Sequence, residues 1–262
     1  MSQPKLDHAA NAQPGDGRWR GLYRIGAVAA LISIVIIPVT IVAFFIWPLF
    51  PDDILLVIQD DWLAGLIGLD FLYLLSNVFA IPFFLVLYVT LKEVDESWAL
   101  MALTLGLIGL VCLVPARPIP EMFALSDQYA AAATEVEKAT TLAAGESMLT
   151  HFHGMAYHAH YVLGSASLLI SSYLMLRSYT FSKATAYVGI VGFALLAASI
   201  PFATYTTTGE STAAVAAIIF VTYFGGGLLT LAWYILVGVR LLRLVRLDGG
   251  PTPNQQYQGR TE

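Results

Sequence analysis

Charge and cysteine are both scarce in this sequence of 262 residues. Charged residues make up 12% of the chain and hydrophobic residues 58%, and the mean hydropathy is +0.72. Soluble chains carry about twice that share of charge, so water is the wrong solvent for most of this protein. The single cysteine, Cys112, excludes an intrachain disulfide framework, a cysteine-rich zinc site and an iron–sulfur cluster held by this chain alone. The formal net charge of -5 argues against a nucleic-acid partner.

Long apolar runs are what the sequence has in abundance. A bilayer core needs about 20 apolar residues per helix. The runs are continuous and rich in Leu, Ile and Ala, whereas the strands of a β-barrel would be shorter and alternate in polarity. We therefore predict an all-α polytopic membrane protein, a bundle of six transmembrane helices. The predicted spans cover residues 25–47, 71–91, 98–116, 155–176, 184–204 and 214–239.

The basic residues predict the direction of these spans. If the N-terminus is cytoplasmic, all the lysines and arginines except Arg117 and Lys138 fall on the cytoplasmic side, as the positive-inside rule requires. We therefore predict that both termini are in the cytoplasm. The membrane domain is expected over residues 19–247, between polar tails at 1–18 and 248–262 whose composition is typical of disordered segments.

The outer segment between the third and fourth spans is long enough to have structure of its own. After the proline-rich stretch at 117–120, apolar residues recur near helical spacing among alanines and charged residues. This pattern predicts an extra amphipathic helix over about 121–148. Such a helix would lie on the rim of the bundle or form a lid over an outward-facing pocket.

Four of the five histidines fall within ten residues at the outer end of the fourth span, as His151, His153, His158 and His160. On a regular helix the pairs that share a face are seven residues apart, which is about 10.5 Å along the axis. A metal ion needs its ligand nitrogens at about 2 Å, so neither pair chelates one ion. No cofactor is therefore predicted, and metal or haem binding stays an alternative to interfacial hydrogen bonding or proton transfer.

Further polar residues lie at the predicted outer ends of the spans. Asp70 begins the second span, and an acid at this depth is costly unless it is paired or hydrated. A histidine of the fourth span is the natural partner, although Asp70 could also lie among the lipid headgroups. We predict an outward-opening ligand pocket at this end. Its candidate residues are Asp70, Asn77, His158, His160, Tyr205 and Glu210.

The last span ends in a basic stripe. Arg240, Arg243 and Arg246 recur every three residues at the predicted inner rim, where they would hold anionic lipid headgroups. Earlier in the same span, Gly225–Gly227 predicts close helix packing, with a hinge as the alternative.

Two short stretches carry a family resemblance. The sequence RGLYRIG at 20–26 enters the first span, and the turn LKE at 91–93 precedes SWAL at 97–100. With the spacing of the last three spans, these stretches resemble an uncharacterised bacterial family of six-span integral membrane proteins, a domain of unknown function. The resemblance covers about residues 20–246. It implies a six-helix fold in a bacterial inner membrane, and it implies no activity or catalytic residues.

These patterns predict a non-catalytic membrane component, which is either a small-ligand or lipid binder or an accessory subunit. Its partners would be membrane lipids, other membrane subunits or a second copy of the chain, and not nucleic acid. One alternative is an oxidoreductase or hydrolase that uses the histidines with a metal or haem, so enzymatic activity is left open. Another is a proton-coupled transporter with Asp70 and a histidine as the relay. The sequence has no Gly-x-Ser-x-Gly nucleophile motif and no Walker-type phosphate loop.

Overall fold

The computed structural model describes residues 19–47, 53–207, 215, 217–218 and 220–247. All regular structure in this part of the chain is helical, which confirms the all-α prediction. Six helical segments of it are long and apolar enough to cross a membrane, so the chain is a multi-pass membrane protein. The predicted tails, 1–18 and 248–262, lie outside the described residues. The long helices are α1 (Arg20–Ile46), α4 (Phe71–Leu91), α5 (Glu96–Leu113), α8 (Met155–Arg177), α9 (Lys183–Thr207) and α11 (Gly225–Leu247).

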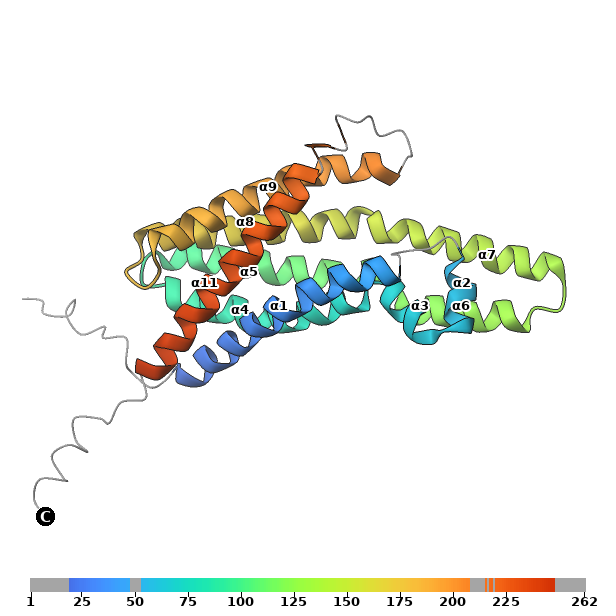
Figure 1. The fold of residues 1–262 in the computed structure, drawn as a ribbon, viewed down its shortest axis with the longest axis horizontal. Coiled ribbons are helices and arrows are strands. Elements are labelled where there is room, and N and C mark those ends of the chain that lie inside the picture. Colours follow the sequence, from blue (N-terminus) through green and yellow to red (C-terminus); the bar gives the residue numbers. More distant parts are fainter. Residues whose placement is uncertain (1–18, 48–52, 208–214, 216, 219, 248–262) are drawn as a thin grey trace, which may run out of the picture.

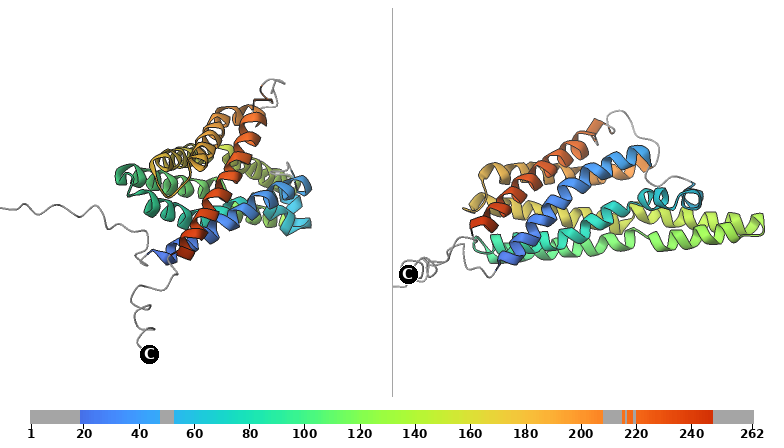
Figure 2. Two further views of the ribbon diagram at one scale, coloured as in Figure 1. Left: turned by 60° about the vertical axis from the view of Figure 1, so that its left-hand side comes forward. Right: turned by 60° about the horizontal axis from the view of Figure 1, so that its bottom comes forward.

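The six long helices form a ring in chain order. Each packs beside its neighbours in the sequence, and α11 closes the ring against α1 (Figures 1 and 2). Short turns at 92–95 and 178–182 explain this order, because they force adjacent helices to run antiparallel. Aromatic and aliphatic side chains fill the centre, among them Phe83, Phe193 and Trp233. The outward faces are apolar as well, which suits contact with lipid rather than water.

One glycine of the triplet in the last span explains the close packing of α9 and α11. A Cβ atom added at Gly226 would lie 3.0 Å from the backbone nitrogen of Leu196, so a larger residue would push the two helices apart. An added Cβ atom at Gly227 meets nothing within 4 Å, and at Gly225 it meets only a Leu195 methyl at 3.9 Å. The triplet directly follows a π-helical turn, η3 (Phe220–Phe224).

The segment between α5 and α8 forms two helices, α6 (Ile119–Ala131) and α7 (Glu135–Leu149), in place of the single helix predicted over 121–148. A capping box starts the second helix. The Thr134 hydroxyl accepts a hydrogen bond from the Glu137 backbone N–H, while the Glu137 carboxylate accepts from the Thr134 N–H. The α6–α7 hairpin does not lie along the rim but continues beyond the ends of the other helices (Figures 1 and 2).

Two short helices, α2 (Ile54–Asp60) and α3 (Trp62–Gly68), complete the structure at this end, where α2 packs against α6. We call α2, α3, α6 and α7 together the head. The head has a small apolar core that is separate from that of the bundle. Gln59 and Ser126 reinforce it, because the Gln59 side chain donates to the Ser126 carbonyl and the Ser126 hydroxyl donates to the Leu55 carbonyl. The buried residues of this core are Ile54, Leu55, Ile58, Leu69, Ile119, Met122 and Phe152.

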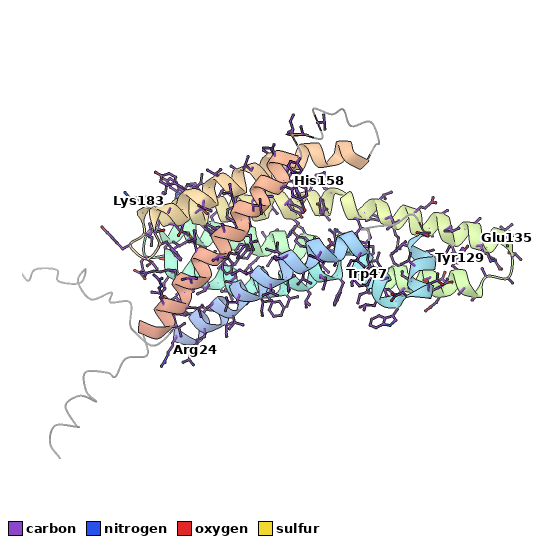
Figure 3. The ribbon with its side chains drawn as sticks, viewed as in Figure 1. Arg24, Trp47, Tyr129, Glu135, His158 and Lys183 are labelled. Atoms are coloured by element: carbon purple, nitrogen blue, oxygen red, sulfur yellow. The ribbon has the colours of Figure 1, made fainter. Side chains whose placement is uncertain are left out.

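Charge is divided between the two ends of the molecule. Together with the N-cap residues Asp53 and Asp61, the head carries eight acidic side chains and one lysine, Lys138. At the opposite end, seven described cationic side chains outnumber three acidic ones at the helix ends and turns. Figure 3 shows this separation, with Arg24 and Lys183 at one end and Glu135 at the tip of the hairpin. We call the cationic end the basic end.

Candidate functional site

Asp70 and Arg117 form a buried ion pair where the head meets the bundle. The Arg117 Nη2 and Nε atoms lie 2.7 and 3.0 Å from Asp70 Oδ2. Only 6% of Asp70 and 4% of Arg117 are exposed. The partner of Asp70 is therefore an arginine that the sequence analysis placed in the outer loop, and not one of the predicted histidines. The short 3₁₀ turn η1 (Val114–Ala116) brings Arg117 to this position directly after α5.

Arg117 also joins other parts of the chain. Its Nη1 donates to the carbonyl oxygens of Ala116 and Phe152, at 3.0 and 3.2 Å. The guanidinium carbon lies 5.1 Å from the ring centroid of Phe152 and 5.2 Å from that of Tyr157, which are cation–π distances. Asp70 lies between α3 and α4, Arg117 between α5 and α6, and Phe152 in η2 (Thr150–His153) between α7 and α8. One side chain thus ties together three passages of the chain between head and bundle.

The backbone at Asp70 has an uncommon conformation. Its φ of 63° and ψ of 30° place it in the left-handed region, and it is the one described residue other than glycine with a positive φ. Asp and Asn tolerate this region better than other residues with a side chain. The carboxylate makes no capping bond to α4 and is used for Arg117 instead. Burial raises the pKa of the Asp70 carboxyl to about 6, and the charge of Arg117 acts in the opposite direction.

His160 connects three helices of the bundle a short distance away. Its Nδ1 lies 2.8 Å from the Gly109 carbonyl oxygen, and its Nε2 lies 2.8 Å from the Tyr73 hydroxyl. A carbonyl oxygen only accepts, so Nδ1 carries the proton, and the Tyr73 hydroxyl donates to Nε2 of the neutral ring. Gly109 makes this possible because α5 and α8 nearly touch there: an added Cβ atom would lie 3.2 Å from the His160 carbonyl oxygen.

Tyrosine rings fill the space between the ion pair and the histidine. Tyr161 stacks on Tyr73 with ring centroids 6.2 Å apart, and it packs against Tyr157 at 4.7 Å. Tyr157 in turn lies over the Arg117 guanidinium. The charged and polar groups are therefore embedded among aromatic rings from α4 and α8. We call the whole set the junction cluster, which consists of Asp70, Tyr73, Arg117, Tyr157, His160 and Tyr161.

The junction cluster contains two of the six residues predicted for the pocket, Asp70 and His160. The other predicted side chains that are described bond within their own helices. Asn77 donates to the Tyr73 carbonyl at 2.7 Å, and His158 Nδ1 lies 2.9 Å from the Gly154 carbonyl. Tyr205 belongs to α9, but its side chain lies outside what the structure describes, as does the whole of Glu210.

The histidine side chains that the structure describes do not converge on one point. His151 is exposed, and the side chain of His153 lies outside the described part. His158 and His160 make the separate hydrogen bonds given above. Among the described residues, no three side chains of His, Cys, Asp or Glu are grouped so that they could hold a metal ion.

The arginines of the last span differ in their surroundings. The Nε atom of Arg240 donates to the Thr180 carbonyl and so ties α11 to the turn between α8 and α9. Arg243 is exposed, and the side chain of Arg246 is not among those described. At least one member of the predicted headgroup stripe therefore also has a structural contact.

Sequence reasoning missed Arg117, Tyr73 and the Gly109 carbonyl as parts of this cluster. A signal for Arg117 was present, because it is one of only two cations in the predicted outer segments and it lies between apolar residues and prolines. A cation in such surroundings needs an acid nearby. The backbone carbonyl at Gly109 has no comparable signal, since every residue carries one.

The fold and the junction cluster define a class of protein: a multi-pass helical membrane protein with a small head joined to its bundle by a buried ion pair. The family described as "Domain of unknown function (DUF4386)" matches residues 22–243, and the chain belongs to it. This confirms the resemblance to an uncharacterised family of membrane proteins. No curated protein and no solved structure matches the chain.

Proposed function

We propose that the protein is a non-catalytic membrane component, an accessory subunit that holds its head rigidly and presents it to a partner. The single observation that carries this proposal is the position of Arg117, which binds Asp70 and the Phe152 carbonyl where three passages of the chain meet. A general acid or base must reach its substrate. The ionisable groups of the junction cluster instead bond to the protein itself, which supports a role as a joint.

The surface of the head favours a partner with a basic segment. Eight acidic side chains against one lysine give the head a negative field, and complementary charge steers association. Val136 is 76% exposed near the tip of the hairpin and offers an apolar contact amid these acids. The positive-inside rule adds an orientation to the proposal, with the basic end in the cytoplasm of a bacterial cell and the head on the other side of the inner membrane.

Site-specific photo-crosslinking in cells tests this proposal. A photoreactive residue at Val136 is expected to give one discrete adduct, whereas the same residue at Val111, which is 69% exposed on α5 within the bundle, should not give it. An adduct of twice the chain mass would identify a second copy, whose head is equally acidic, and would contradict a partner with a basic segment. Reversing two exposed charges of the head with Asp127→Lys and Glu146→Lys should abolish the adduct. Identical adducts at both positions, or an adduct insensitive to charge reversal, would contradict the proposal.

A second candidate function, proton-coupled transport, is favoured by one observation in the last span. The π-helical turn Phe220–Phe224 runs directly into Gly225–Gly227, and such turns recur at functional sites. Transport would require this part of the span to bend while substrate passes. The variant Asp70→Asn distinguishes the two candidate functions. In a transporter it should abolish pH-dependent flux, whereas in an accessory subunit it should weaken the attachment of the head.

A further inference from the structure

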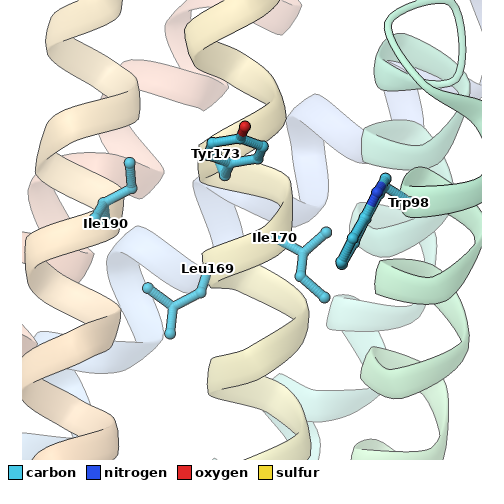
Figure 4. A pocket seen from close by; sticks show the side chains of 5 residues that line it. All are labelled: Trp98, Leu169, Ile170, Tyr173 and Ile190. Carbon is cyan, nitrogen blue, oxygen red and sulfur yellow. The ribbon is translucent and has the colours of Figure 1, made fainter.

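An apolar groove lies on the outer surface of the bundle toward the basic end. It has a volume of about 330 Å³ and runs between α5, α8 and α9. Figure 4 shows the Trp98 ring of α5 facing Ile170 of α8, with Tyr173 one turn further along. The lining residues are Trp98, Leu169, Ile170, Tyr173 and Ile190.

A second groove of about 320 Å³ continues the first along α8 and α9. The two grooves share Leu169, and together they form one apolar furrow between α8 and α9. Small side chains at Ala166 and Ala197 leave the space that the second groove occupies. The lining on α8 runs from Val162 to Tyr173, about 16 Å along the helix, which suits an extended hydrocarbon chain better than a compact polar ligand.

Both walls of the furrow end in an exposed cation. On α8, Arg177 follows Tyr173 by four residues and so lies on the same helix face. On α9, Lys183 precedes Ile190 by seven residues, again on the same face. Arg177 is the last residue of α8 and Lys183 the first of α9, so only the short turn at 178–182 separates them. Among the described residues, neither cation has an ion pair.

The acids of the basic end lie at the start of α5, next to Trp98. Glu93 and Asp95 belong to the turn before α5 and Glu96 is its first residue, and Asp95 accepts a hydrogen bond from the Trp98 backbone N–H. Arg240, by contrast, contacts the Thr180 carbonyl and adds a third positive charge at the α8–α9 turn. Positive charge is therefore concentrated above the furrow on the side of α8 and α9.

We propose that this furrow binds an anionic phospholipid. One acyl chain lies between α8 and α9, and the phosphate lies between Arg177 and Lys183. Trp98 and Tyr173 then sit at the level of the headgroup, where aromatic residues of membrane proteins are enriched. Basic residues next to the bilayer attract anionic headgroups, while the apolar furrow selects a lipid over a soluble anion. The proposal does not depend on the partner of the head.

Lipid titration of the purified full-length protein in detergent tests the site. Phosphatidylglycerol should raise the thermal unfolding midpoint and remain bound in native mass spectrometry, and phosphatidylcholine should do so far less. The double variant Arg177→Gln, Lys183→Gln should bind phosphatidylglycerol about 30-fold more weakly. The matched control Arg24→Gln removes an exposed charge at the same end, on α1 away from the furrow, and should leave the affinity within about twofold.

A furrow variant and a soluble anion complete the test. Ala166→Phe fills the furrow without changing charge and should also weaken phosphatidylglycerol binding. Inorganic phosphate alone should not stabilise the protein. Equal effects of the two lipids, undiminished binding by the double variant, undiminished binding by Ala166→Phe, or equal stabilisation by phosphate would each overturn the proposal.

Discussion

Asp70 and Arg117 are 47 residues apart in the chain, yet their side chains meet at 2.7 Å in the buried joint between head and bundle. In this buried region, the Arg117 guanidinium binds the Asp70 carboxylate and donates to the backbone carbonyls of Ala116 and Phe152. Desolvation makes such a pair costly to form, but removing one partner leaves a buried charge without compensation. The joint should therefore be sensitive to single substitutions.

The first prediction concerns this ion pair. Asp70→Asn removes the charge but keeps a residue that tolerates the left-handed backbone, and Arg117→Gln removes the other charge. Each is expected to lower the free energy of unfolding by about 3–5 kcal/mol. The combination should cost clearly less than the sum, as measured by unfolding in detergent micelles.

A matched control comes from the exposed pair Lys138–Glu135, whose atoms lie 3.3 Å apart. Lys138→Gln should change stability by less than about 1 kcal/mol. Strict additivity of the two substitutions at Asp70 and Arg117, or single effects as small as that of Lys138→Gln, would show that the pair does not act as a buried unit.

The second prediction concerns the hydroxyl of Tyr73. Tyr73→Phe leaves the Nε2 atom of the buried His160 without its donor, so unfolding should become easier by about 1–3 kcal/mol. Tyr179→Phe removes a hydroxyl from a fully exposed side chain and serves as the control. Thermal unfolding of both variants measures the difference. Equal midpoints for the two would mean that the Tyr73–His160 bond contributes nothing to stability.

The third prediction separates packing from hinge motion in the last span. Gly226→Ala places a Cβ atom 3.0 Å from the Leu196 backbone nitrogen and should destabilise the protein by about 1–3 kcal/mol. Gly227→Ala has open space and should be neutral or stabilising by up to about 1 kcal/mol, because alanine favours helix. Unfolding in detergent measures both. Loss of function in a fully stable Gly227→Ala variant would instead indicate a hinge.

The fourth prediction concerns the start of α7. Thr134→Ala removes one half of the capping box and should weaken the first turn of this helix by about 1 kcal/mol. Hydrogen exchange of the backbone amides at 136–138 should become several-fold faster, while exchange in α8 stays unchanged. Thr140→Ala, within the same helix, is the control. Unchanged exchange at 136–138 in Thr134→Ala would argue that the box does not hold this turn.

The sequence was informative where a single physical requirement dominates. Runs of about 20 apolar residues in a chain with little charge predict membrane helices, and the structure has six of them. Asp70 was identified as a site residue because an acid at the start of a span needs a partner. The break between α6 and α7 was missed because alanines at 131–133 favour continuing a helix, although the Thr134-x-x-Glu137 pattern of a capping box was visible.

The rest of the junction cluster depends on tertiary structure. The turn η1 brings Arg117 to Asp70, and the direction of this turn cannot be predicted from the composition of the sequence. The hydrogen-bond acceptors at Gly109 and Phe152 are backbone carbonyls, so the identity of these residues does not predict that they accept hydrogen bonds here. The four histidines within ten residues suggested a shared site, but His158 and His160 contact different partners in the structure.

Distance measurement across the joint tests most directly the claim that Arg117 holds the head in place. Spin labels at Val136 of α7 and Val162 of α8, in a background with Cys112→Ala, report on the two sides of the junction. Pulsed electron resonance should give one narrow distance distribution with Arg117 intact and with Lys138→Gln, and a broad one with Arg117→Gln. An equally narrow distribution in a folded Arg117→Gln variant would contradict the account.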